Sequence, residues 1–401
     1  MRSTKPTRVC MVAYTNYPSD ARVRREAETI AAQPEYEVTF ITLKEGDIPR
    51  TYRKDGVIVR ELDIEKYQGK SRIKYVFSYL KFLLTAFNAV NGLLISGKID
   101  IVHVHNMPNF LVFAALGPRI FGKKVILDIH DSIPETYLSK FESRRNQIVF
   151  KLLCLEESIC CRMAHRIVCV NHVQRDGLVE RGLDAAKIFI SMNVPDPRIF
   201  KRDSGNPAPP EKPDGFNLVY HGTVSKRLGI DIAIQAVAKL KDKIPQLRFN
   251  VLGLGDDLEE FIELAANLGI RDLVYFSRRV DPIEEIVELV RHMDMGVISN
   301  RRNLATEFML PVKMLEYVSL GIPIVAPRLK AIQYYFDQDM VRYFEPEDVD
   351  SLARAILELY TDPDLRGKQV AEADRFLGIY GWDNHKFDLL NVYRELRGAA
   401  D

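Results

Sequence analysis

Short apolar runs alternate with amphipathic stretches along most of this chain. In the first half the apolar runs predict strands over residues 8–13, 37–43, 57–61, 101–105, 124–129, 166–170 and 187–191. In the second half they predict strands over residues 218–221, 248–252, 273–276, 295–298 and 324–326. Helical patterns lie between the strands, and such alternation indicates mostly parallel sheets covered on both faces. The pattern predicts an α/β protein with two Rossmann-like, doubly wound domains.

A polar, proline-rich stretch separates the two alternating regions. Residues 201–213 read KRDSGNPAPPEKP, a composition typical of a linker. The last helical pattern follows Trp382, the only tryptophan of the chain. We therefore predict domains over residues 1–200 and 215–380, a linker over 201–214 and a C-terminal helical segment over 381–401.

Composition restricts the possible partners. Lys and Arg together number 56 against 55 for Asp and Glu among 401 residues, so no strongly basic field points to nucleic acid. The five cysteines include no C-x-x-C pair, which favours reduced, buried thiols. The N-terminus enters the first strand without the apolar stretch of a signal peptide. These features predict a cytoplasmic protein.

Residues 73–95 form the most apolar helical stretch. Lys74, Lys81, Asn88 and Asn91 interrupt it at helical spacing, so it reads as an amphipathic helix that does not span a membrane. Packing on its own domain is the favoured interpretation. Because further basic residues precede it, the alternative is a helix that lies on the anionic inner face of the cytoplasmic membrane.

The segment EFMLPVKMLEY, residues 307–317, combines a turn with the start of a helix. Pro311 suits a first helical turn, because its ring fixes φ and it has no N–H to leave unpaired. The opening amides of residues 309–312 then remain free, and with the positive end of the helix dipole they form an anion site. Farther along, Glu316 offers a carboxylate to sugar or ribose hydroxyls. The segment predicts a nucleotide site, with a merely solvated Glu316 as the alternative.

A second segment supports a phosphate-containing ligand. Residues 217–231 read as an apolar strand, a loop with Gly222, two adjacent cations, and a helix that starts near Gly229. Gly222 permits close approach of the backbone to a ligand, and Lys226 or Arg227 can neutralise a diphosphate.

Together, these two segments resemble the donor half of a retaining, family-four glycosyltransferase of the GT-B fold, in both order and spacing. The resemblance implies a nucleotide-sugar donor, a glycan or lipid-linked acceptor, an interdomain cleft, and a C-terminal helix that crosses back onto the first, acceptor-binding domain. It implies no cofactor. The donor-binding residues that it implies are Gly222, Thr223, Lys226, Arg227, Gly253, Met309, Leu310, Pro311, Val312 and Glu316.

One departure from the family lies in the donor half. The first of the family's two glutamates would fall at Phe308, whereas this chain has Glu307 one position earlier. Either a shift of the loop lets Glu307 act in its place, or the main chain alone holds the sugar. We predict His130, Arg227 and Glu307 as catalytic residues.

The first domain supplies the candidates for acceptor binding. Because ligands of open α/β sheets bind at the carboxyl ends of strands, the loops after the first, fourth and fifth predicted strands are expected to line the site. The acceptor-side residues predicted there are Asn16, Asp20, Arg22, His105, Asn106, Asp131 and Glu135. The first loop lacks the glycine pair of many family members and carries instead the subgroup pattern D-x-R-V-x-R-E-A; an arginine-rich, solvated helix is the alternative for Arg22.

His130 is the predicted catalytic histidine of this domain. In the resembling family a histidine lies near the scissile bond at this place, and imidazole can shuttle a proton near neutral pH. A core histidine bonded to the backbone is the alternative. Histidines 103, 105 and 130 with Asp131 and Glu135 are legitimate metal ligands, but their spacing forms no closed site, so no metal is predicted.

Two other functions remain open. A nucleotide-sugar 2-epimerase shares this architecture, and a catalytically silent nucleotide-sugar-binding scaffold is compatible with Phe308 and the missing glycine pair. The sequence favours a metal-independent glycosyltransferase of polysaccharide or glycoconjugate synthesis.

Overall fold

The computed structural model describes residues 5–67, 69, 71–140, 145–202, 214–280 and 282–398. The chain forms two compact units, one made of Met1–Asn193 with His385–Asp401 and the other of Val194–Asn384. The boundary thus lies at residue 193, a few residues before the predicted one at 200. Most of the predicted linker, residues 203–213, lies outside the described residues.

The first unit is built on an eight-stranded sheet with the order β3-β4-β2-β1-β5-β6-β7-β8. Its strands are β1 (Thr7–Val12), β2 (Tyr36–Leu43), β3 (Thr51–Lys54), β4 (Val57–Leu62), β5 (Ile101–His105), β6 (Lys124–Ile129), β7 (Arg166–Cys169) and β8 (Ile188–Ile190). All seven predicted strands are present, and the pairings among these seven are all parallel. The sequence missed β3, a short and largely polar edge strand that pairs antiparallel with β4.

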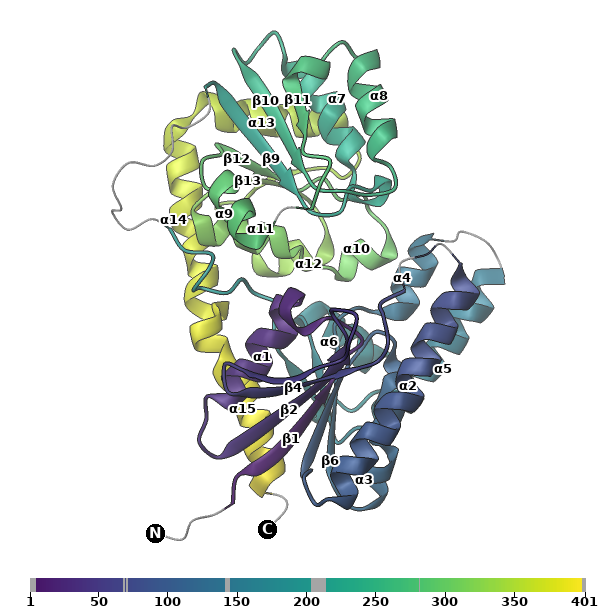
Figure 1. The fold of residues 1–401 in the computed structure, drawn as a ribbon. Coiled ribbons are helices and arrows are strands. Elements are labelled where there is room, and N and C mark those ends of the chain that lie inside the picture. Colours follow the sequence, from purple (N-terminus) through teal and green to yellow (C-terminus); the bar gives the residue numbers. More distant parts are fainter. Residues whose placement is uncertain are drawn as a thin grey trace. The chain divides into compact units, whose positions relative to one another are not determined.

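Helices cover both faces of this sheet (Figure 1). They are α1 (Ala21–Ala31), α2 (Arg72–Ile95), α3 (Leu116–Ile120), α4 (Ile133–Lys140), α5 (Arg145–Met163) and α6 (His172–Glu180), with 3₁₀ helices η1 (Tyr17–Ser19), η2 (Asn109–Ala115) and η3 (Ala185–Lys187). Successive side chains of β5 point to opposite faces of the sheet. Val102 and Val104 join the apolar core that includes α2 and η2, whereas His103 and His105 point to the face that carries α1.

The C-terminal helix α15 (Trp382–Gly398) adds to the first unit from His385 onward. Leu390, Val392 and Tyr393 are buried, and the Tyr393 hydroxyl lies 2.6 Å from His103 Nδ1. This end of the chain therefore completes the face of the sheet on which His103 and His105 lie.

The second unit is a six-stranded, all-parallel sheet with the order β11-β10-β9-β12-β13-β14. Its strands are β9 (Phe216–His221), β10 (Leu247–Leu252), β11 (Val274–Phe276), β12 (Met295–Val297), β13 (Ile324–Pro327) and β14 (Arg342–Phe344). The five predicted strands are present. The sequence missed β14, a three-residue edge strand that starts with arginine.

Helices again flank the sheet of the second unit (Figure 1). They are α7 (Ile230–Leu240), α8 (Leu258–Asn267), α9 (Ile283–Val290), α10 (Leu304–Phe308), α11 (Val312–Leu320), α12 (Lys330–Tyr335), α13 (Val349–Thr361) and α14 (Pro363–Tyr380), with η4 (Lys226–Leu228) and η5 (Arg271–Leu273). Apolar side chains of α7, α8 and α13 form one core with β9, β10 and β12. Each of the two units therefore has the doubly wound α/β architecture that the sequence predicted.

Helix α2 packs on its own unit through one face only. Phe82, Ala86 and Val90 are buried in the core, whereas Ile73 and Phe77 are 71% and 67% exposed. By length and composition alone, Ile73–Ile95 is long and apolar enough to cross a membrane. The predicted packing against the domain is thus present, and it leaves a second apolar face exposed.

Candidate functional site

Two glycine turns meet at the carboxyl ends of β9 and β10. Gly222 follows β9 with φ of +106°, and Gly253 follows β10 with φ of +148°. A Cβ on Gly253 would lie 2.0 Å from the Gly222 carbonyl oxygen, so no side chain fits there. The two loops therefore approach each other backbone to backbone, which excludes a side chain at Gly253, while the positive φ of Gly222 favours glycine there.

The N-terminus of α11 lies close to these turns, since Lys313 of its first turn approaches Gly222. Pro311 is the cap residue and Val312 the first helical residue, one position later than predicted. The Met309 amide donates to the Thr306 carbonyl at 3.3 Å, which corrects the prediction that it is free. The amides of Leu310 and Val312 have no backbone acceptor among the described residues. Together with the helix dipole, they remain suited to an anion.

Lys313 is a residue of this site that the sequence reasoning missed. Its Nζ atom lies 3.7 Å from the centre of the Tyr220 ring and 3.4 Å from where a Cβ on Gly222 would be. Burial lowers the pKa of Lys313; the Glu316 charge opposes this shift and the Arg227 charge adds to it, and together they bring the pKa to about 7. A lysine in the first turn of a predicted anion-binding helix was the signal that could have revealed it.

The two predicted loop cations differ in their surroundings. Lys226 is exposed and pairs with Glu260 at 2.7 Å, while its amide donates to Asp257 at 2.8 Å. Arg227, in contrast, lies close to Tyr220 and Lys313: its charge opposes the rise that burial causes in the pKa of Tyr220, and it adds to the fall that burial causes in the pKa of Lys313. Of the two, Arg227 is the cation next to the glycine turn.

Glu316 is held by a histidine from the neighbouring strand. His221 Nε2 lies 2.5 Å from Glu316 Oε2, and His221 Nδ1 lies 3.0 Å from the Tyr317 hydroxyl. Since a carboxylate only accepts, Nε2 carries the proton and donates it, which fixes the orientation of the carboxylate. His221 was not predicted, although it directly precedes Gly222.

Glu307 is committed to contacts within its own unit. Its Oε2 accepts from the Lys330 amide at 2.6 Å, at the start of α12, and its Oε1 lies 3.1 Å from Arg302 Nε. Its side chain is only partly exposed. These contacts connect the end of α10 to the start of α12. The catalytic role predicted for Glu307 stays a prediction.

A cavity of about 310 Å³ opens at the carboxyl ends of β1, β5 and β6 in the first unit. It is lined by Ala13, Tyr14, Thr15, Asp20, Val23, Lys66, Tyr75, Tyr79, His105, Asn106, Met107, His130 and Asp131. Five of the predicted first-domain residues are thus brought together, namely Asp20, His105, Asn106, His130 and Asp131.

The other predicted acceptor-side residues make internal contacts. Asn16 donates from Nδ2 to the Lys44 carbonyl at 2.8 Å. Arg22 and Glu135 are 5% and 2% exposed, and Glu135 pairs with Arg181 at 2.5 Å. Neither Arg22 nor Glu135 lines the cavity. The solvated helix offered as the alternative for Arg22 is wrong, because α1 buries this residue. The acceptor-side roles predicted for Arg22 and Glu135 stay predictions.

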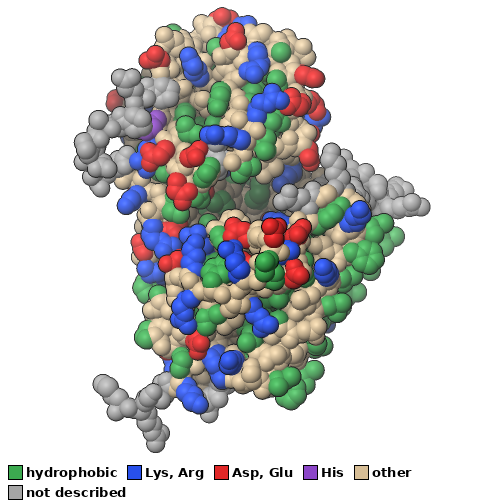
Figure 2. All heavy atoms as spheres, in the orientation of Figure 1, with side chains coloured by type: hydrophobic (Ala, Val, Ile, Leu, Met, Phe, Trp, Pro, Cys, Tyr) green, Lys and Arg blue, Asp and Glu red, His purple; other side chains and the backbone are tan. Residues whose placement is uncertain are grey.

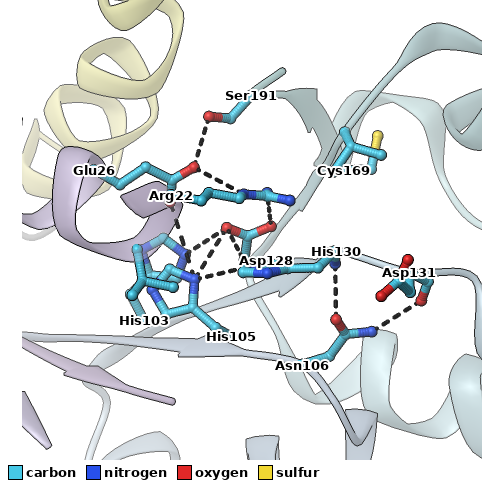
Figure 3. A network of polar contacts seen from close by, with 12 residues as sticks. Arg22, Glu26, His103, His105, Asn106, Asp128, His130, Asp131, Cys169 and Ser191 are labelled. Carbon is cyan, nitrogen blue, oxygen red and sulfur yellow. Dashed lines mark hydrogen bonds and ion pairs between the residues drawn. The ribbon is translucent and has the colours of Figure 1, made fainter. Parts of the chain in front are cut away.

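Beneath the cavity lies a buried polar network (Figure 3). His130 Nε2 lies 3.0 Å from His105 Nδ1 and 3.4 Å from Asp128 Oδ2, and the His130 amide donates to Asn106 Oδ1 at 2.8 Å. His130 is 18% exposed, whereas Asp128 is fully buried. His105 and Asp128 are paired in the parallel register of β5 and β6, which is why they meet. The network holds His130 at the cavity wall.

Arg22 of α1 compensates the negative charge of this network. Arg22 Nη2 donates to Asp128 Oδ1 at 2.7 Å, and Arg22 Nε lies 3.4 Å from Glu26 Oε1, which also accepts from Ser191 at 2.9 Å (Figure 3). Burial raises the pKa of Glu26, helped by the nearby Asp128 charge. Burial would also raise the pKa of Asp128, but Arg22 and His130 outweigh it and hold this pKa well below its usual range. Ionised Asp128 therefore stabilises the fold above about pH 4, and this contribution is lost as the pH falls further.

Glu26, His103, His105 and Asp128 offer ligand atoms within 4.8 Å of one another, a spacing that a metal ion can bridge. Arg22 already neutralises one of the two carboxylates. With neutral imidazoles, a bound dication would turn one excess negative charge into one excess positive charge in a fully buried place, which is unfavourable. Burial lowers the pKa of His105, which keeps it neutral. The cluster fits an ion-pair network better than a metal site, and the predicted absence of a metal stays a prediction.

Comparison with known families gives a consistent result for both units. Residues 22–194 match the family model described as Glycosyltransferase Family 4, and residues 215–362 match the model described as Glycosyl transferases group 1. The chain is 26% identical over 362 residues to a D-inositol 3-phosphate glycosyltransferase of Corynebacterium urealyticum, covering 85% of this chain and 82% of the relative. It is 23% identical over 325 residues to a phosphatidyl-myo-inositol mannosyltransferase of Mycolicibacterium smegmatis, covering 80% and 78%.

Solved structures give the same fold. The Anabaena protein HepE in complex with UDP is similar over 98% of this chain and 99% of its own, with a TM-score of 0.66 and 13% identity. Other solved structures reach TM-scores between 0.60 and 0.76. The predicted GT-B fold is confirmed.

The buried network predicts a large effect of Asp128→Asn. This variant should lower the free energy of unfolding of the first unit by about 3–5 kcal/mol, because it leaves the Arg22 guanidinium buried without its nearest counter-charge. Urea denaturation at pH 7, with hydrogen exchange of β5 and β6 peptides as the readout, measures the loss.

The control is Asp63→Asn in the same unit. Asp63 is 73% exposed and pairs with Lys44 at the surface, so this change should alter the stability little. Equal stabilities of the two variants would show that the network at Asp128 does not stabilise the unit.

Proposed function

Because the chain belongs to the family-four glycosyltransferases of the GT-B fold, we propose that it is a retaining enzyme that moves a sugar from a nucleotide-diphosphate sugar to a glycan or lipid-linked acceptor. The acceptor belongs to the synthesis of cell-surface polysaccharide or glycoconjugates. The donor binds the second unit and the acceptor the first.

The observation that carries this proposal is the arrangement around Glu316. A carboxylate fixed by His221 lies one turn beyond Lys313, whose ammonium approaches Gly222 at the open helix N-terminus. Ribose hydroxyls donate well to a fixed, charged acceptor, while the amides of Leu310 and Val312 suit the phosphates. The site thus offers an acceptor for ribose and donors for a diphosphate within one helical turn.

Departure of the nucleoside diphosphate leaves negative charge that the protein has to stabilise. Arg227 and the α11 amides supply fixed positive charge at the glycine turn, and preorganised donors of this kind contribute about 3–4 kcal/mol each to lowering a barrier. In the proposed reaction the acceptor oxygen attacks the anomeric carbon on the face that the diphosphate leaves, and the departing phosphate oxygen takes the acceptor proton.

The first unit offers His130 for the reacting sugar. Its ring is fixed by His105 and Asp128, lines the cavity, and is 18% exposed, whereas the His105 and Asp128 side chains are fully buried. A fixed imidazole at this place can hydrogen-bond the transferred sugar or hold a proton during transfer. Asn106 and Asp131, at the same wall, are the proposed contacts for acceptor hydroxyls.

The exposed face of α2 supports peripheral contact with a membrane on the cytoplasmic side. Ile73, Phe77 and Leu84 repeat at helical spacing and are each more than 60% exposed, and apolar side chains gather along this edge of the unit in Figure 2. A cavity of about 840 Å³ beside them is lined by Lys44, Asp63, Ile64, Glu65, Lys66, Tyr67, Gly69, Lys74, Phe77, Ser78 and Lys81. Lysines next to an apolar stripe fit an anionic lipid surface.

Incubation with UDP-, GDP- and ADP-sugars tests the proposed reaction. A transferase should release free sugar slowly from one of these donors in the absence of acceptor, and addition of millimolar Mg²⁺ or Mn²⁺ should change the rate less than about twofold, because protein cations neutralise the diphosphate.

The two alternative functions predict different results in the same incubation. A 2-epimer of the sugar would indicate an epimerase, and nucleotide binding without turnover would indicate a scaffold. Strong stimulation by a divalent ion would contradict the metal-independent diphosphate site.

The ribose site predicts the effect of Glu316→Gln. The amide keeps the shape but loses the charge, so the free nucleoside diphosphate should bind about 10- to 150-fold more weakly by calorimetry. Glu358→Gln, at an exposed pair with Arg342, serves as the matched control. Unchanged affinity in Glu316→Gln would make this residue structural.

The exposed face of α2 predicts binding to vesicles. The wild-type protein should sediment with phosphatidylglycerol vesicles more than with phosphatidylcholine vesicles, and less at high salt. Phe77→Ser should weaken this binding about tenfold, because it removes one large apolar side chain from the lipid contact. Phe387→Ser, an exposed phenylalanine of α15, is the control, and an equal loss in both variants would refute the assignment to α2.

A further inference from the structure

The short helix η4, which carries Arg227, is held by the loop that follows β12. Each of the three backbone carbonyls of η4 accepts a hydrogen bond from this loop. Arg301 donates twice, from Nε to the Lys226 carbonyl at 3.0 Å and from its amide to the Arg227 carbonyl at 3.2 Å. Ser299 Oγ donates to the Leu228 carbonyl at 2.8 Å. The backbone of η4 is therefore fixed along its whole length by the loop after β12.

The two loops are also in direct contact through their backbones. A Cβ on Gly229, which directly follows η4, would lie 1.9 Å from the Ser299 carbonyl oxygen. Ser299 itself is fully buried. Close packing of this kind leaves η4 little room to shift relative to the loop after β12.

The guanidinium of Arg301 is committed to contacts within the protein. Besides the bond from Nε, its Nη1 lies 3.3 Å from Glu347 Oε2, and its Nη2 donates to Asp231 Oδ2 in the first turn of α7. Two carboxylates thus compensate its single positive charge. Arg301 therefore connects η4, α7 and the Glu347 loop instead of offering its charge to a ligand.

Arg227 has the opposite environment. Its guanidinium forms no ion pair or hydrogen bond with another residue that the structure describes, whereas its backbone carbonyl is bonded to the Arg301 amide. Since no partner side chain orients this guanidinium, its place beside the Gly222 turn depends on the backbone that carries it.

The loop after β12 is also bonded to the segment that leads into α11. The Arg301 carbonyl accepts from Thr306 Oγ1 at 2.6 Å, and Thr306 is fully buried in α10. Helix α10 precedes α11, whose amides at Leu310 and Val312 are the proposed phosphate donors. Arg301 thus links the two groups that are proposed to stabilise the leaving diphosphate, the η4 cation and the α11 amides.

We propose that Arg301 is a positioning residue that acts through Arg227, by fixing the η4 backbone so that the Arg227 guanidinium lies where the charge of the leaving diphosphate develops. This inference rests on the proposed function, and Arg301 itself does not contact the ligand. A displaced cation still attracts the bound donor, but it stabilises the developing charge less well, because such stabilisation depends on preorganised groups.

The kinetics of donor hydrolysis in the absence of acceptor measure this role. The donor is the UDP-, GDP- or ADP-sugar that the wild-type protein hydrolyses. Arg301→Met removes the side-chain bonds to η4, so kcat should fall about 10- to 100-fold, while the KM for the donor should change less than about threefold. Arg342→Met is the matched control, because Arg342 is 38% exposed against 32% for Arg301 and pairs with Glu358. This control should keep both constants.

A double substitution distinguishes positioning from a general loss of structure. Arg227→Met alone should lower kcat by about 100-fold. In the Arg227→Met background, Arg301→Met should lower kcat by less than a further threefold or so, because the group that Arg301 positions is already absent. Losses that multiply would show that Arg301 acts independently of Arg227 and would overturn the inference.

Ser299→Ala is a milder variant of the same contact. It removes one hydrogen bond to η4 and should lower kcat about three- to tenfold, with the same lack of additivity toward Arg227→Met. Thermal unfolding verifies that each variant folds, and Ser299→Ala decides the question if Arg301→Met does not fold.

The remaining outcomes separate this inference from the proposed function. Hydrolysis by the wild-type protein together with an unchanged kcat in folded Arg301→Met or in Ser299→Ala would overturn the inference and leave the proposed function intact. Absence of hydrolysis of every donor by the wild-type protein would overturn both.

Discussion

Parallel pairing places the carboxyl ends of neighbouring strands at one edge of each sheet, and both candidate sites lie at such an edge. In the first unit the edge brings together His105 at the end of β5 and His130 just after β6. In the second unit it brings together the turns at Gly222 and Gly253. The strands bury apolar side chains on both faces, so polar groups are concentrated where the strands stop.

The two candidate sites differ in how their charged side chains are compensated. In the first unit Asp128 and Glu26 lie below the surface, and Arg22 from α1 compensates them within the protein. In the second unit Arg227 and Lys313 lie close together, and their positive charges are compensated only in part by Glu316. The first arrangement holds an imidazole in place, whereas the second has the uncompensated positive charge that suits an anion. This difference agrees with an acceptor site in one unit and a diphosphate site in the other.

Helix α11 links the chemistry of the second unit to its fold. Its first turn presents open amides and Lys313, its second turn presents Glu316, and Tyr317 anchors it by packing against Gly296 and bonding to His221. The same helix therefore sets the spacing between the proposed phosphate and ribose contacts. Glu307, just before it, is instead committed to Arg302 and the start of α12.

The sequence by itself determined the α/β class, twelve of the strands, the turn at Gly222 and the helix that carries Glu316. These features depend on local patterns, since apolar runs, glycines and a proline act through near neighbours. The short edge strands β3 and β14 were missed because few apolar residues mark them. Only the tertiary structure decided that Arg22 is buried, that His221 holds Glu316 and that Lys313 lies over Tyr220. The environment of each of these side chains comes from residues far away in the chain, such as Asp128 for Arg22. A local pattern could mark Lys313 as a candidate by its place in the first helical turn, but it could not place its ammonium over Tyr220.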